Sequence, residues 1–171
     1  MTLNLARPPE RLTSGKTMGS KSTSLMHRNL PLLLLQARER LMVRFRPILN
    51  DNNITEQQWR ILRVLLDAKA LEPREIGELC RISSPSLVGV LNRMEELGLI
   101  SRRRFEQDQR RVRVTPTARS RALATRMAPQ IEAVYRDIEE LIGEDLRDHL
   151  YVVLDRLITT LEPYAQDAEQ A

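Results

Sequence analysis

The sequence predicts a mainly α-helical fold with one short β-hairpin. Apolar residues recur at intervals of three and four through most of the chain, as they do along one face of a helix. Capping residues and prolines stand where such helices would begin, and glycines stand where two of them would end. An arginine-rich stretch, residues 100–114, interrupts this pattern and is predicted to form two short strands.

Composition limits the classes of protein that this chain can represent. It has 171 residues, enough for one domain with a core that must be largely aliphatic, because only 4% are aromatic. One cysteine excludes a disulfide framework and two histidines exclude a histidine-rich metal site, so we expect no cofactor. The longest apolar run, residues 32–35, is too short to span a bilayer, so we expect a cytoplasmic protein with no membrane partner.

Charge is distributed unevenly along the chain. Residues 1–54 carry a net +6 and residues 55–121 a net +5, whereas residues 132–171 carry −8. Of the 27 basic residues, 24 are arginine, which makes bidentate contacts to phosphate and guanine that lysine cannot make. This asymmetry predicts that the basic region meets a polyanion and that the acidic end does not.

The first helix is predicted over residues 30–49, after a disordered basic tail at residues 1–27 that lacks apolar periodicity. Pro31 suits the first turn of this helix. Pro47 is expected to kink or close it, because proline has no N–H to donate to the preceding turn. One stripe of the helix carries Leu34, Arg38, Leu41, Phe45 and Ile48.

A second helix is predicted to begin after Thr55 and to end near Ala68. Thr55 and Gln58 have the spacing of a capping box, and Ile54 and Trp59 have that of a hydrophobic staple. The expected buried face consists of Trp59, Leu62, Leu65 and Leu66.

Two more helices follow in close succession. A short one over residues 73–80 is expected to direct Ile76, Leu79 and Cys80 inward, with Cys80 as a buried small hydrophobe rather than an oxidant sensor. The next uses Ser84 as its N-cap and Pro85 as its first residue, and it stops at Gly98. Its expected core positions are Leu87, Val90 or Leu91, Met94 and Leu97.

The rest of the chain is predicted to form a hairpin and two helices. Strands are expected over residues 100–105 and 110–114. Thr115 and Pro116 are expected to cap and begin a long helix that ends at Gly143, and a last helix over residues 144–162 has one apolar face. The apolar seam of the long helix comprises Met127, Ile131, Val134, Ile138 and Leu141.

This order of elements is that of a winged helix-turn-helix with a small two- or three-stranded β-wing, here over residues 54–115. Helical segments 28–53 and 116–163 are predicted to form a dimerisation region, and residues 164–171 a flexible C-terminal tail. We therefore expect a homodimer that binds double-stranded DNA, with two recognition helices in successive major grooves of a palindrome.

The helix from Ser84 is the expected recognition helix, because the face opposite its core positions is available for DNA. Val88 can touch a thymine methyl group, and Gly89 lets the backbone approach closely. In the hairpin, Arg110 can enter a narrow minor groove, and Asp108 is expected to hold an arginine or the turn. A solvated helix face and hairpin are the alternative. The predicted DNA contacts are Ser84, Ser86, Val88, Gly89, Asn92, Arg93, Arg104, Arg110 and Arg111.

The recognition helix and the wing resemble those of the MarR family of bacterial transcription regulators. The resemblance rests on residues 84–95 and 108–114 and extends from about Leu30 to Leu161. Short segments at residues 37–39, 45–48 and 55–61 resemble the HpaR-type subgroup, named for the regulator of homoprotocatechuate degradation. Family members often have Leu-Thr and then Gly where the wing meets the long helix, whereas this chain has Pro116-Thr117 and Ser120.

The resemblance implies a homodimeric repressor that a small aromatic carboxylate releases from DNA. It implies an effector of the hydroxylated phenylacetate or pyridine carboxylate type, bound between the dimer helices and the DNA-binding lobe. A constitutive or pleiotropic regulator without an effector is the alternative. No enzyme is expected, because the sequence supports no nucleophile–base pair, carboxylate dyad or phosphate loop.

Arg38 is the central candidate for an effector site, because it lies in an apolar stripe and a buried arginine needs an anionic partner. That partner is Glu39, an acid of another helix, or the carboxylate of a ligand. Trp59 offers an aromatic wall, although its staple role alone accounts for it, and His27 could close over a pocket or remain solvated. The candidate effector residues are Arg38, Trp59, Phe45, Met42 and His27.

Overall fold

The computed structural model describes residues 27–104 and 111–168. These residues form six helices and a two-stranded antiparallel sheet, which confirms the mainly α-helical class and the predicted order of elements. In chain order they are α1 (Leu30–Asp51), α2 (Glu56–Ala68), α3 (Pro73–Cys80), α4 (Ser84–Glu96), β1 (Ile100–Arg104), β2 (Val112–Pro116), α5 (Ala118–Ile142) and α6 (Glu144–Ala168).

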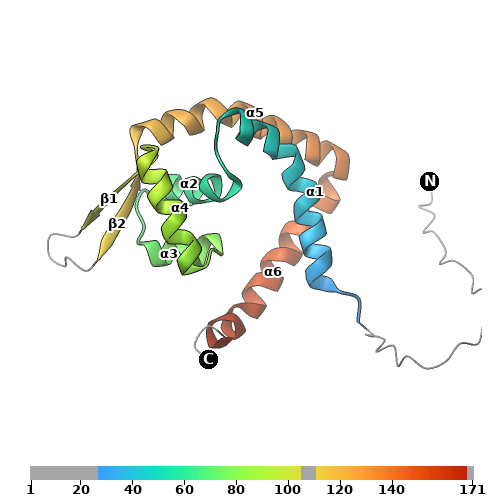
Figure 1. Ribbon diagram of the computed structural model, residues 1–171. Coiled ribbons are helices and arrows are strands. Elements are labelled where there is room, and N and C mark those ends of the chain that lie inside the picture. The colour runs from blue at the N-terminus through green and yellow to red at the C-terminus, as the bar shows by residue number, and fades with distance from the viewer. Residues whose placement is uncertain (1–26, 105–110, 169–171) are drawn as a thin grey trace, which may run out of the picture.

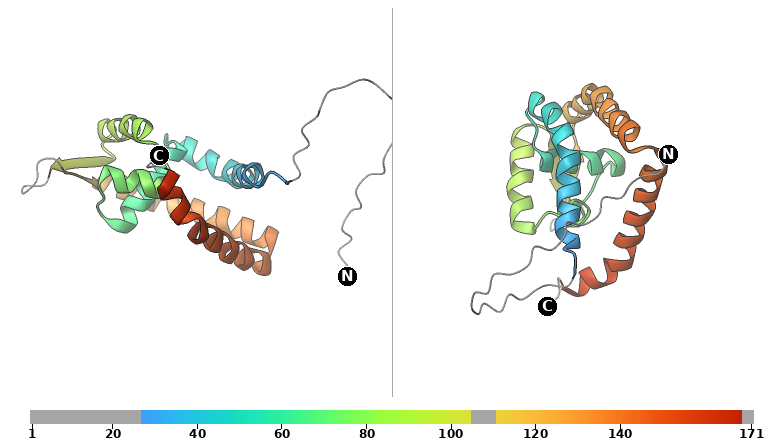
Figure 2. Two further views of the ribbon diagram at one scale, coloured as in Figure 1. Left: turned by 90° about the horizontal axis from the view of Figure 1, so that it is seen from below. Right: turned by 90° about the vertical axis from the view of Figure 1, so that its right-hand side faces the viewer.

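The elements gather at two ends of the molecule. Helices α2, α3 and α4 and the hairpin form a lobe at one end, and α1 and α6 extend away on the other side (Figures 1 and 2). Helix α5 runs from the hairpin to α6 and so connects the two ends. Within the described residues, no helix combines the length and the apolar character that crossing a membrane would require.

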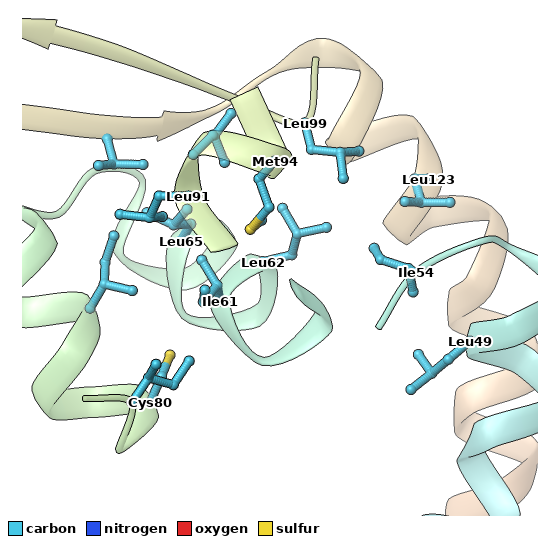
Figure 3. Close-up of a cluster of buried hydrophobic side chains, with 14 of the residues drawn as sticks. Leu49, Ile54, Ile61, Leu62, Leu65, Cys80, Leu91, Met94, Leu99 and Leu123 are labelled. Carbon is cyan, nitrogen blue, oxygen red and sulfur yellow. The ribbon is translucent and has the colours of Figure 1, made fainter. Parts of the chain in front are cut away.

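One hydrophobic cluster holds the lobe together and continues into α1 and α5. Ile61, Leu62 and Leu65 of α2 are completely buried and lie near Leu91 and Met94 of α4 (Figure 3). The same cluster includes side chains from the other two helices, so the lobe is not a separate globule. These side chains are Phe45 and Leu49 of α1 and Leu123, Met127, Ile131 and Ile138 of α5.

The buried face of α2 is rotated from the predicted one. Trp59 and Leu66 are only half-buried, whereas Ile61 is fully buried and Gln58 is also buried. Helix α2 contacts α1, α3, α4 and β2, so its apolar side must be wider than a single stripe. The prediction that Leu79 points inward is also wrong, because Leu79 is 60% exposed, while Ile76 and Cys80 on the same helix are buried.

Two helix starts differ from the prediction by one or two residues. Ser83, not Ser84, precedes α4 in extended conformation, so Pro85 takes the second helical position. Pro116 ends β2 opposite Ile100 and does not begin α5. Thr117 is the N-cap instead, because its Oγ1 accepts from the Ser120 amide at 3.2 Å while its hydroxyl donates to the Gly98 carbonyl at 2.7 Å.

Two helices are longer than predicted. Pro47 does not end α1, which runs to Asp51, and the burial of Leu49 favours this continuation. Helix α6 extends to Ala168, past the end predicted for this helix at residue 162. Pro163 lies inside this helix and does not stop it. The start of α2 agrees with the prediction, because the Thr55–Gln58 capping box is formed, and so does its end at Ala68. The end of α5 agrees as well, with Gly143 at a φ of 78° directly after Ile142.

The side chains of Arg38, Glu39, Arg46 and Glu56 form an ion-pair cluster that fastens α1 to the start of α2. Arg38 binds Glu39 at 2.7 Å and Glu56 at 2.8 Å, and Arg46 binds Glu56 at 2.7 Å and also contacts Glu39. Hydrogen bonds from Arg46 and Arg38 lower the pKa of Glu56, and bonds to Glu39 and Glu56 raise the pKa of Arg46. Glu56 is therefore ionised throughout the neutral range.

Glu56→Gln should lower the free energy of unfolding in a pH-dependent way. Because the folded-state pKa of Glu56 lies below its ordinary value of 4.5, its carboxylate stabilises the fold above that pH and loses this effect as pH falls through the folded-state pKa. The difference between wild type and Glu56→Gln should be constant above about pH 6 and shrink below it. Urea unfolding at several pH values and one protein concentration measures this difference.

The exposed α5 residue Glu140 offers a matched control. Glu140→Gln should change the unfolding free energy little at any of these pH values. A Glu56→Gln difference that does not vary between pH 3 and pH 7 would show that this cluster contributes no charge-dependent stability.

Candidate nucleic-acid interface and effector cavity

The outward face of α4 is open along its whole length. The core positions Leu87, Leu91 and Met94 are buried, and all six residues predicted to contact DNA from this helix are exposed. Val88 is 58% exposed, and a Cβ built on Gly89 meets no atom within 4 Å. The six exposed residues are Ser84, Ser86, Val88, Gly89, Asn92 and Arg93.

A groove of about 820 Å³ lies where α3 meets the start of α4. Ser84 and Val88 line it together with Arg74 and Arg81. Arg81 has a left-handed backbone conformation, with a φ of 49°, and occupies the turn between the two helices. The sequence interpretation did not include Arg74 or Arg81, because their placement beside α4 depends on how the turn folds.

The hairpin of β1 and β2 projects from the lobe beside α4 and α3 (Figure 1), and both of its strands carry arginines. Arg104 is exposed at the end of β1. Arg111 is also exposed, but its Nε donates to Glu72 at 2.9 Å, so this side chain also joins the wing to the start of α3. The predicted wing-tip residues Asp108 and Arg110 lie outside the described residues.

Arg102 joins the first wing strand to the recognition helix. Its Nε donates to Oε2 of Glu95 at 2.8 Å, and its backbone N–H donates to Oε1 of the same carboxylate at 3.1 Å. A further bond runs from Nη2 of Arg102 to Oδ1 of Asn92 at 2.8 Å. Sequence reasoning missed this role, because it treated the arginines of the hairpin as one charged group.

Arg38 is not the buried arginine that the apolar stripe predicted. Its side chain is 42% exposed, and its guanidinium binds Glu39 and Glu56. The reason is that the N-terminal half of α1 packs little against the other described residues, so Leu34 and Leu41 on the same stripe are exposed as well. Two of the partners considered for Arg38 are therefore present: Glu39 on the same helix and an acid of another helix, Glu56.

A cavity of about 320 Å³ lies between α2 and α5. Trp59 and Leu66 line it from α2, and Ile131 lines it from α5. Arg63, one turn after Trp59, lines the same cavity, and within residues 27–104 and 111–168 it makes no ion pair. Sequence reasoning missed Arg63, although its spacing of four from Trp59 on a helix places both on one side.

The other candidate effector residues do not line this cavity. Phe45 is buried, and its ring centroid lies 5.0 Å from that of Tyr135. Met42 is half-buried against the core, and His27 is exposed just before α1. Cys80 is 1% exposed and burial raises the pKa of its thiol, which fits the predicted role of a small hydrophobe.

Comparison with known proteins agrees with this geometry. The family model described as "MarR family" matches residues 52–111, which span α2 to the hairpin. The homoprotocatechuate degradative operon repressor of Escherichia coli is 40% identical over 133 residues, covering 78% of this chain and 90% of that protein. Two solved structures are similar as well.

One is NadR in complex with 4-hydroxyphenylacetate, with a TM-score of 0.69 and 39% identity, covering 79% of this chain and 96% of that one. The other is the transcriptional repressor CouR bound to a 23-mer DNA duplex, with a TM-score of 0.68 and 27% identity, covering 75% of this chain and 91% of that one. The chain therefore belongs to the MarR family of transcriptional regulators.

Proposed function

We propose that this chain is a ligand-responsive repressor that binds a palindromic operator as a homodimer and is released by a small aromatic carboxylate. The observation that carries the proposal is the open outward face of α4, flanked by an arginine-rich hairpin. A helix with exposed short polar side chains and a glycine suits the major groove, and arginines beside it suit phosphates.

The homodimer is supported by apolar side chains that the single chain leaves exposed. Helix α6 has no buried residue over residues 144–164, where its burial is described, and the first turns of α1 are also largely exposed. Monomeric proteins rarely leave this many apolar side chains exposed. We therefore infer that a second copy of the chain buries them in a symmetric dimer. The exposed residues include Leu30, Leu34, Leu35, Leu146, Leu150, Val153, Leu154, Ile158 and Leu161.

The cavity between α2 and α5, which Asp67 and Glu132 also line, offers an aromatic wall and an arginine to a small aromatic acid. Its volume of about 320 Å³ falls at the lower end of the range for ligand sites. Trp59 can stack on a ring, and Arg63 can pair with a carboxylate. We propose Arg63 as the anchor in place of Arg38, because Arg38 is already neutralised by Glu39 and Glu56. The ring-degradation effectors considered from the sequence fit this chemistry, and a NadR structure contains one of them, 4-hydroxyphenylacetate.

A regulator without an effector is the second candidate function. The pairing of Arg38 with two protein carboxylates favours it, because this arginine then has no need of a ligand. The two candidates differ in whether a small acid binds the folded protein and weakens its hold on DNA.

Arg63→Met should abolish the response to a small aromatic acid. A ligand that binds only the folded state raises the melting temperature, by roughly 5 °C or more at a hundredfold excess over Kd. We expect 4-hydroxyphenylacetate to raise the melting temperature of the wild type and to release it from DNA, and to do neither with Arg63→Met. Thermal shift and a mobility assay measure the two effects.

Arg38→Met is the matched comparison, since it removes the other candidate anchor. It should lower the melting temperature of the unliganded protein and still respond to the acid. A response that survives in Arg63→Met and disappears in Arg38→Met would restore Arg38 as the anchor. No response in the wild type to a panel of aromatic acids would favour the regulator without an effector.

Gly89→Ala should separate folding from DNA binding. Alanine has space at this exposed helical position and should stabilise the protein by about 0.5–1 kcal/mol. If the α4 backbone approaches DNA closely at Gly89, the added methyl group should weaken binding about tenfold or more. Chemical unfolding and a binding titration with one duplex measure both effects, and unchanged affinity in a more stable protein would contradict the proposed contact.

A further inference from the structure

Asn92 on the outward face of α4 has a fixed side-chain orientation. Its Oδ1 accepts a hydrogen bond from Nη2 of Arg102 at 2.8 Å. A guanidinium carries only donors, so the amide must present its oxygen and not its nitrogen to Arg102. The amide N–H₂ of Asn92 is therefore the group left to face a partner outside the chain.

Arg102 is itself held in place by Glu95, which lies three residues after Asn92 on α4. The carboxylate of Glu95 accepts from the Arg102 guanidinium at 2.8 Å and from its backbone N–H at 3.1 Å. Both side chains are partly shielded, at 30% and 38% exposure. The bonds from Arg102 also lower the pKa of Glu95, so the carboxylate is ionised at neutral pH. We call this pair the Glu95–Arg102 relay, and it joins the recognition helix to β1 through these hydrogen bonds.

This arrangement limits what Asn92 can read in DNA. A free asparagine reads adenine with two bonds, accepting from N6 and donating to N7. That contact needs Oδ1 and Nδ2 side by side against one base edge. The bond to Arg102 takes up one of the two lone pairs of Oδ1 and holds this oxygen toward β1, so the amide turns its N–H₂ donors toward a base.

We propose that the Glu95–Arg102 relay sets base specificity by turning the amide of Asn92 so that its N–H₂ donors face the base. Guanine is the base that suits such a donor best, because its major-groove edge presents two acceptors, N7 and O6. Arg102 and Glu95 act here as positioning residues, and Asn92 is the residue that meets the base. This inference rests on the proposed function, in which α4 enters the major groove.

The test is selection of binding sites from a pool of random DNA duplexes by the full-length protein and its variants. Asn92→Ala identifies the base-pair position that Asn92 contacts, because the base preference of the protein should be lost at that position alone. The wild type should favour guanine at that position. Arg102→Met frees the amide, so the affinity for adenine relative to guanine there should rise roughly 5- to 100-fold. Glu95→Gln weakens the hold on Arg102 and should change the preference in the same direction.

Arg103→Met is the matched control, because it removes the same charge from the next position of β1. It should weaken binding to all sequences without changing the preferred base. Glu95→Gln keeps the size of the side chain, and it tests the relay even if Arg102→Met is poorly folded.

Three results would overturn the inference. The first is an unchanged base preference in folded Glu95→Gln and Arg102→Met. The second is an equal loss of affinity for every sequence in Asn92→Ala, which would make Asn92 a phosphate contact. The third is a wild-type protein that enriches no sequence at all, in which case the proposed function fails first and the inference fails with it.

Discussion

The packing of α2 in the core is the constraint on which the other elements depend. Ile61, Leu62 and Leu65 are completely buried, and α3, α4 and β2 all contact this helix. At its start, Glu56 ties α2 to α1 through two arginines. Because α2 contacts α1 as well as α3, α4 and β2, it links the extended first helix to the elements that carry the DNA-binding face.

This geometry suggests how a small ligand could control DNA binding. The cavity beside Trp59 and Arg63 lies between α2 and α5, and α5 is the helix that connects the lobe to α6. A ligand that fits one α2–α5 separation better than another shifts the population toward that separation. In a dimer, this changes the spacing of the two α4 helices. The shift can be no larger than the ligand's difference in affinity for the two states.

Local signals allowed much of the fold to be predicted, and tertiary contacts account for the rest. The Thr55 capping box and the stop at Gly143 depend on a few adjacent residues, and both are present. Thr115-Pro116 misled the prediction, because a proline that suits a helix start also suits the end of an edge strand. The exposed face of α4 could be predicted from its own periodicity.

The roles of Arg38, Arg63 and Arg102 could not be predicted in the same way. The partner of Arg38 on α2 is 18 residues away, and Arg63 matters only because α5 closes a cavity beside it. Arg102 reaches Asn92 only after β1 has folded back along α4. An arginine-rich sequence predicts a polyanion partner but does not say which arginines are already paired within the protein.

The spacing of the two recognition helices is the quantity that tests this account most directly. Nitroxide labels at Glu96→Cys, an exposed position at the end of α4 outside the predicted DNA contacts, would report it by double electron–electron resonance in the dimer, with the buried Cys80 replaced by alanine. With DNA bound, the helices should adopt the spacing of successive major grooves, ~34 Å between half-sites. Adding 4-hydroxyphenylacetate should move the distance distribution away from its DNA-bound form. A distribution that stays the same while calorimetry shows the acid bound would contradict the account.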